Sequence, residues 1–130
     1  MREILFRGKT ESGEWVYGGF CYGNNRNESI ICPRNDFSKE VIPETIGQYT
    51  GLTDKNGKKI FEGDIIASAL HWLERPKNGV VIFRNGSFGL LWYRGEVEQF
   101  NPFTSMCNVE YEIIGNIHGN PELLKGENNA

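Results

Sequence analysis

Glycine-rich turn signals separate short runs of β-favouring residues along this chain. Sixteen of its 130 residues are glycine, which supplies the positive-φ positions of tight turns and weakens helix interiors. The clearest case is Val80–Tyr93, where two apolar runs flank Asn85-Gly86, a dipeptide that suits a type I′ turn. We therefore predict a β-hairpin here, within a fold made mainly of strands and tight turns.

Further strands are predicted by short apolar or alternating runs at residues 3–7, 15–22, 29–32 and 109–113. Gly18 and Gly19 interrupt the second run and indicate a bend or bulge. Pro43 has no amide hydrogen, so strand pairing around it is expected to be brief or confined to a sheet edge.

Three other segments are less regular. Residues 95–105 show no clean periodicity and contain Pro102, so a long loop is expected. Residues 67–73 fit either a short helix or a continued strand, and this choice stays open. Asn120, Pro121 and Glu122 resemble an N-cap, a first helical residue and a first-turn acid, which predicts one short helical turn.

Two aspartates are expected to stabilise turns. Asp54 precedes Asn56-Gly57, where a hairpin or tight bend is expected, and Asp64 follows Gly63, so each carboxylate can accept local backbone N–H bonds. These acids, with Asn56 and Glu62, could also supply oxygen ligands to Ca²⁺ or Mg²⁺. Their spacing does not match an EF-hand loop, so we predict no metal here.

Cysteine and histidine usage gives no sign of a metal centre or of catalysis. Cys21, Cys32 and Cys107 are an odd number without a CxxC pair, so we interpret them as reduced, mostly buried thiols. Their wide spacing also argues against a zinc site with His118. His71 and His118 lack a nucleophile or orienting acid at any motif spacing. We predict no cofactor, no catalytic residue and no enzymatic activity.

Charge and hydropathy limit the partners and the compartment. The net charge is −3 and the pI about 5.4, which disfavours nucleic-acid binding unless basic residues gather on one face. No apolar run approaches the roughly 20 residues of a membrane helix, and the first residues lack the apolar stretch of a secretory signal. We therefore expect a cytoplasmic protein without a membrane partner.

A contact surface is the best candidate site. Exposed aromatic residues on a protein surface bind peptides and single-stranded nucleic acid. Strand alternation places Trp92 and Tyr93 on opposite sheet faces, so at least one of them is expected in the core. The basic residues of the same region could gather into a patch beside the aromatic residues. The alternative is that their charges are scattered and individually solvated. The candidate residues are Trp72, Trp92, Tyr93, Phe100, Arg75, Arg84 and Arg94.

The segment Val41–Ile66, VIPETIGQYTGLTDKNGKKIFEGDII, resembles the signature of the YopX family of phage and prophage proteins. The resemblance extends to REILFRGK, GEWVYG and YEIIGNIHGNPELL, which together span most of the chain. It implies a mainly β (α+β overall) fold, with an N-terminal β-rich lobe (1–49) packed on a C-terminal SH3-like small barrel (50–119). Residues 120–130 would form a short helical turn and a frayed tail. The family resemblance carries over no catalytic residue.

These observations lead to three hypotheses about function. The first is a non-enzymatic phage or prophage accessory protein in the bacterial host cytoplasm, whose barrel binds a host or phage protein and which forms a homo-oligomer through a free strand edge. The second is nucleic-acid binding through the aromatic and basic residues of the barrel. The third is an enzyme with scattered active-site residues.

Overall fold

The computed structural model describes residues 3–23, 28–67, 78–103 and 111–124. The chain forms two compact units, Met1–Gly51 and Leu52–Ala130. The described residues are mainly strand, with a helical segment at residues 122–124, so the mainly β fold class is confirmed. In chain order the strands are β1 (Phe6–Lys9), β2 (Trp15–Tyr22), β3 (Ser29–Cys32), β4 (Lys39–Thr53), β5 (Lys59–Phe61), β6 (Asp64–Ala67), β7 (Gly79–Arg84), β8 (Ser87–Arg94), β9 (Val97–Pro102) and β10 (Glu112–Asn116).

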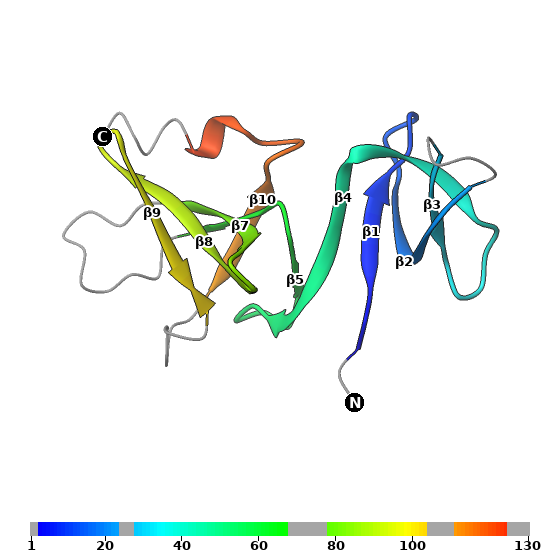
Figure 1. The fold of residues 1–130 in the computed structure, drawn as a ribbon, viewed down its shortest axis with the longest axis horizontal. Coiled ribbons are helices and arrows are strands. Elements are labelled where there is room, and N and C mark those ends of the chain that lie inside the picture. The colour runs from blue at the N-terminus through cyan, green and yellow to red at the C-terminus, as the bar shows by residue number, and fades with distance from the viewer. Residues whose placement is uncertain (1–2, 24–27, 68–77, 104–110, 125–130) are drawn as a thin grey trace. The chain divides into compact units, whose positions relative to one another are not determined.

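Strands β1 to β4 of the first unit close into a ring. β1 pairs with β2, β2 with β3 and β3 with β4, and β4 returns to β1, with every pair antiparallel. Figure 1 draws these strands from blue to cyan-green. Val16, Ile31 and Val41 are buried in the core of the ring, and Phe6 and Ile46 pack against them. Closure of a sheet in this way pairs both edges of each strand.

Pro43 lies inside the long strand β4, and pairing is interrupted around it, as predicted, because the β1–β4 register skips from Ile42 to Gly47. β4 pairs with β3 through Val41 and with β1 through Gly47, on either side of the proline. The β1–β4 register is irregular at this point, and the Lys9 N–H donates to the Thr45 hydroxyl at 2.8 Å. A bulge of this kind accommodates a proline because no ladder bond needs its missing N–H.

Gly18 and Gly19 do not form a bulge. Gly18 pairs with Phe6 at the end of the β1–β2 ladder, Gly19 pairs with Cys32 at the start of the β2–β3 ladder, and neither ladder has a register shift here, so β2 changes partners between the two glycines. A Cβ atom on Gly18 would lie 2.2 Å from the Cys32 carbonyl oxygen. Gly18 is therefore required because two backbones approach closely, whereas Gly19 has no atom within 4 Å of its corresponding position.

The second unit contains a five-stranded antiparallel sheet of order β10-β6-β7-β8-β9. Asn85 and Gly86 both have positive φ, at 52° and 82°, which confirms the predicted β7–β8 hairpin. The buried core residues of the second unit are Ile60, Ile66, Val81, Leu90, Trp92 and Tyr111.

The long loop expected at residues 95–105 is instead largely strand β9, which pairs with β8 from Val97 to Pro102. The polar run Glu98-Gln99 hid the alternation, because both faces of this strand are only partly covered. Pro102 ends the strand, where a missing amide hydrogen is tolerated. The strand expected at residues 109–113 is found as β10, three residues later at both ends, and residues 104–110 lie outside the described part.

Aspartate carboxylates stabilise the turns around β5, as predicted. Asp64 accepts the Phe61 N–H at 2.8 Å, and Asp54 accepts the N–H groups of Asn56 and Lys58 at 2.8 and 2.9 Å. The bend at Asn56-Gly57 is tight, but only its glycine has positive φ, at 83°. It is therefore not a type I′ turn, which requires positive φ at both central residues.

The C-terminal segment is tied to these turns by backbone bonds. The Lys55 N–H donates to the Tyr111 carbonyl, and the Ile117 N–H donates to the Gly63 carbonyl, both at 2.8 Å. Beyond β10, the Leu123 N–H donates to the Asn120 carbonyl at 3.1 Å, which marks the predicted short helical turn. Of the segment left open at residues 67–73, Ala67 ends β6, and residues 68–77 lie outside the described residues.

Candidate functional site

The predicted contact residues that the structure describes do not all lie on one surface. Trp92 is 5% exposed, belongs to the core, and donates its indole N–H to the Asn101 side-chain oxygen. Tyr93 is 38% exposed and follows Trp92 in β8, so it faces the opposite side of the sheet. Trp92 is thus a core residue and Tyr93 a surface residue, as strand alternation predicts.

Arg84 and Phe100 share the Tyr93 face of the sheet by their register. The Arg84 guanidinium carbon lies 5.5 Å from the centroid of the Phe100 ring, and Arg84 also forms an ion pair with Glu98. The Phe100 ring packs where a side chain on Gly89 would stand. Arg84 is therefore held by an acid and an aromatic ring, which reduces its attraction for an external anion.

Of the remaining predicted contact residues, Arg94 belongs to the described part of the chain and does not join this group. Arg94 is exposed, pairs with Val97 across the β8–β9 turn, and has the strand parity of Trp92. Trp72 and Arg75 lie outside the described residues. Lys55, near the earlier turn, forms an ion pair with Glu112 at 3.5 Å. The described basic residues of the second unit therefore do not form one uninterrupted patch.

The described residues contain no group of three or more histidine, cysteine or acidic side chains that could hold a metal ion. Asp54 is one of the acids considered as a cation ligand. Its carboxylate accepts hydrogen bonds from backbone N–H groups, including the Ile113 N–H at 3.2 Å. Burial raises its pKa, but hydrogen bonds from the Lys58, Ile113 and Asn56 N–H groups outweigh burial and hold the pKa below 3.8. Its role is structural, since a full set of donors already surrounds it.

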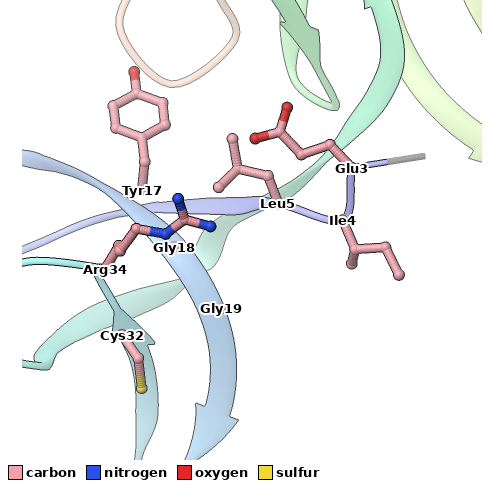
Figure 2. Close-up of a pocket in the computed structure, with 8 residues that line it drawn as sticks. All are labelled: Glu3, Ile4, Leu5, Tyr17, Gly18, Gly19, Cys32 and Arg34. Carbon is pink, nitrogen blue, oxygen red and sulfur yellow. The ribbon is translucent and has the colours of Figure 1, made fainter. Parts of the chain in front are cut away.

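An open pocket on the first unit was not predicted from the sequence. Its volume is about 650 Å³, within the range of small-ligand and peptide side-chain pockets. Figure 2 shows the residues that line it. They are Glu3, Ile4, Leu5, Tyr17, Gly18, Gly19, Cys32 and Arg34.

Strands β2 and β3 and the segment before β1 position these residues. Val16 is buried in the core, so its neighbour Tyr17 and then Gly19 face outward by alternation. Cys32 lies directly across from Gly19 on β3. The other wall is held in place because the Leu5 carbonyl accepts the Tyr49 N–H at 2.8 Å.

Gly19 forms an open part of this wall, and the fold does not require a glycine there. Its φ is not positive, and no atom lies within 4 Å of the place a Cβ would occupy. Glycine inside a strand costs roughly 0.5–1 kcal/mol relative to alanine. Such a glycine often marks a place where a ligand or another backbone approaches closely. The missing side chain leaves room in the pocket.

Charge in the pocket comes from one base and one acid. Figure 2 shows the Arg34 guanidinium and the Glu3 carboxylate pointing toward each other, with the Leu5 side chain between them. Both residues are exposed. Among the described residues, no carboxylate lies within 4 Å of the Arg34 side chain as an ion-pair partner. Its planar array of donors is therefore available to a carboxylate or phosphate.

Two thiols meet beside this pocket. The Cys21 and Cys32 sulfur atoms lie 3.4 Å apart on the paired strands β2 and β3. Cys21 is exposed and Cys32 half-buried, so the prediction of mostly buried thiols was wrong for Cys21. The hydrogen bond with Cys32, then burial, then the charge of Cys32 raise the pKa of the Cys21 thiol. Cys107 lies outside the described residues.

A second hollow of about 430 Å³ lies on the same unit and contains two acids, Glu11 and Glu40, with no base in its lining. Pro43, Val41 and a serine–threonine rim complete it. This composition repels anions and offers no aromatic side chain for stacking. The pocket around Gly19 and Arg34 is therefore the stronger candidate site.

Sequence reasoning missed the pocket because its residues come from three separate segments and form no motif. One signal was present in the sequence. Gly18 and Gly19 stand together inside a strand. The close approach of two backbones requires a glycine at position 18, but no packing contact requires one at position 19. The basic residue Arg34 belongs to none of the strands or motifs predicted from the sequence.

The architecture and this site describe a small, mainly β protein with an open, mixed polar and apolar pocket and no described metal cluster. The YopX protein family model matches residues 5–125, and the chain belongs to this family. No curated protein matches the chain. The chain is similar to a solved structure, the crystal structure of protein EF1440 from Enterococcus faecalis, at 26% identity and a TM-score of 0.56. That match covers 95% of this chain and 99% of the other.

Within the described residues, no helix combines the length and the apolar character needed to cross a bilayer.

Proposed function

We propose that this YopX-family protein is a non-enzymatic phage or prophage accessory protein that binds another protein in the cytoplasm of the bacterial host. The bound segment of the partner, a host or phage protein, carries a carboxylate beside an aliphatic side chain. The carboxylate pairs with Arg34, and the aliphatic group lies against Leu5 and over Gly19. The site serves binding alone, because its lining combines no nucleophile with an oriented general base.

The observation that carries this proposal is the open surface at Gly19. This glycine weakens the strand, yet it has no positive φ and no neighbouring atom that would exclude a side chain. The close approach of a ligand would explain why a glycine stands there. Arg34 sets the chemistry of that ligand, because a guanidinium recognises carboxylates through two parallel N–H bonds. The apolar side chains of Ile4 and Leu5 favour a peptide over a free inorganic anion.

Peptide-display selection against the whole protein tests this function. We expect the selected peptides to contain Asp or Glu next to an aliphatic residue, and we expect Arg34→Ala and Gly19→Val each to weaken their binding at least about tenfold, roughly 1.4 kcal/mol. Arg84→Ala is the matched control, since that arginine already has an acid partner. Selected peptides that bind Arg34→Ala and Arg84→Ala equally well would rule out the pocket.

We also propose that the second unit, across residues 50–119, is an SH3-like small barrel. Its support is the strand order β10-β6-β7-β8-β9, in which β6 to β9 form an antiparallel meander and β10 pairs with β6. The turn at Glu62-Gly63, closed by the Asp64 carboxylate, supports the same assignment. SH3-like barrels commonly serve as binding modules, which agrees with a binding role by analogy of fold alone.

Pairing between copies of the chain is a further part of this proposal. Within the described residues, β9 pairs on one side only, with β8. An edge strand of this kind can pair with a second chain. Sedimentation analysis of the whole protein checks it, and Glu98→Pro in β9 is expected to lower the dimer fraction.

Nucleic-acid binding is the second candidate function, supported by Tyr93, Phe100 and Arg84 on one face of the second unit. The ion pair of Arg84 with Glu98 and the net charge of −3 weigh against it. If about four phosphates were neutralised, log affinity for a single strand would fall against log salt with a slope near −3. We expect no measurable salt-dependent binding of an oligonucleotide.

A further inference from the structure

We infer that Cys21 and Cys32 form a cross-strand dithiol that low-molecular-weight disulfides, such as oxidised glutathione, convert into an internal disulfide. The two residues stand eleven positions apart in sequence. Their strands are paired, with Gly19 opposite Cys32 and Cys21 opposite Ile30. Both side chains therefore point to the same outward face of the sheet, which is the arrangement that brings their sulfur atoms together.

The distance and the exposure of the thiols support oxidation. The sulfur atoms are 3.4 Å apart, so bond formation needs an approach of about 1.4 Å to reach the disulfide length of about 2.05 Å. Side-chain rotation and a small strand adjustment can supply a shift of this size. Cys21 is exposed and can meet a small oxidant directly, while Cys32 is half-buried and stands ready as the second thiol.

The reaction proceeds in two exchange steps that balance. The Cys21 thiolate attacks one sulfur of the oxidised glutathione, which forms a mixed disulfide and releases one glutathione thiolate that takes up a proton. Cys32 then loses its proton and attacks the Cys21 sulfur. The internal S–S bond forms, the mixed disulfide breaks, and a second glutathione leaves as its thiol. Two electrons pass from the protein thiols to the oxidant.

The open strand surface explains why the pair can react without unfolding. Gly19 carries no side chain beside Cys32, and nothing lies within 4 Å of its Cβ position. Figure 2 shows the Cys32 thiol pointing away from the Arg34 guanidinium. Oxidation thus takes place at the margin of the pocket, on the side away from the Arg34 guanidinium.

Redox titration of the whole chain carrying Cys107→Ser tests this inference. The protein is equilibrated in reduced and oxidised glutathione buffers, quenched with acid, alkylated and mapped by peptide mass. We expect a peptide pair joined through Cys21 and Cys32 that has lost two hydrogen atoms. Cys21→Ser and Cys32→Ser variants in the same background are expected to stop at the mixed disulfide.

The folded state provides the decisive comparison. We expect the equilibrium constant for ring closure to be at least about tenfold larger in buffer than in concentrated urea, which corresponds to about 30 mV for this two-electron couple. Should Cys107→Ser fail to fold, peptide mapping of the oxidised wild-type chain answers the same question. Mixed glutathione adducts without an internal bond, or equal closure in urea, would overturn the inference.

Discussion

Replacing Asp54 by alanine removes the acceptor for three backbone N–H groups at once. The Asp54 carboxylate is 5% exposed and bonds Asn56 and Lys58 within its own turn and Ile113 at the start of β10. The last of these bonds joins segments 59 positions apart in sequence. Asp54 therefore fastens the β4–β5 turn to the C-terminal strand, and its loss should be felt by the whole second unit.

The loss of stability expected for Asp54→Ala depends on how far each of the three N–H donors is buried. A hydrogen bond to a charged group contributes about 1.5–3 kcal/mol, and a buried donor left alone costs about 1–3 kcal/mol. The Ile113 N–H is partly buried, so removal of its hydrogen bond is expected to cost about 2 kcal/mol of stability. The two donors in the exposed turn recover most of their bonding from water, at about 0.5 kcal/mol each. The expected loss for Asp54→Ala is therefore about 3 kcal/mol.

Urea unfolding followed by circular dichroism measures this loss. With an m value of about 1–3 kcal/mol per molar, the midpoint should fall by about 1–3 M. Asp36→Ala is the matched control, because Asp36 is exposed and its ion pair with Lys39 is a surface contact, for which an effect within about 0.5 kcal/mol is expected. A loss below about 1 kcal/mol for Asp54→Ala, or one equal to the control, would refute this reasoning.

The same residue gives a pH dependence. Its pKa is lowered in the folded protein, because burial, which raises it, is outweighed by the three N–H donors. Its stabilising contribution is then complete above the unfolded pKa of 3.8 and is lost as pH falls through the lower folded pKa. The stability difference between wild type and Asp54→Asn should stay constant from neutral pH to about pH 5 and shrink below pH 4.

Three further substitutions test the packing. Gly18→Ala should destabilise by about 2 kcal/mol because its Cβ would meet the Cys32 carbonyl oxygen at 2.2 Å, whereas Gly19→Ala should leave stability unchanged or raise it by about 0.5–1 kcal/mol; equal losses in thermal melts would contradict the distinction. Tyr111→Phe should keep or increase stability by up to about 1 kcal/mol, because its hydroxyl is buried without a hydrogen-bond partner in the described structure and burial raises its pKa to about 12. A clear loss in urea unfolding would show that the hydroxyl is satisfied.

Much of the fold could be predicted because local physics specifies it. Asn85-Gly86 determined the β7–β8 hairpin, since both residues adopt positive φ, and the aspartate turns followed from side-chain reach. Strands β2 and β3 appear at the predicted residues because short runs of apolar residues marked them. These signals depend on a few neighbouring residues.

The features that escaped prediction depend on contacts between distant segments. Strand β9 lacks alternation, so only its pairing with β8 makes it a strand. Pro43 sits in a long strand because a bulge opposite Lys9 accommodates it. The pocket joins Arg34 to residues before β1, and the two thiols meet only because β2 and β3 pair in one register.

Backbone amide chemical shifts give the most direct test of the binding site. A ¹⁵N-labelled chain would be titrated with a selected acidic peptide. We expect the shifted amides to cluster at Leu5, Gly18, Gly19, Cys32 and Arg34, and the shifts to disappear in Arg34→Ala. Shifts confined to Tyr93, Phe100 and their neighbours on the second unit would contradict the assignment of binding to the first-unit pocket.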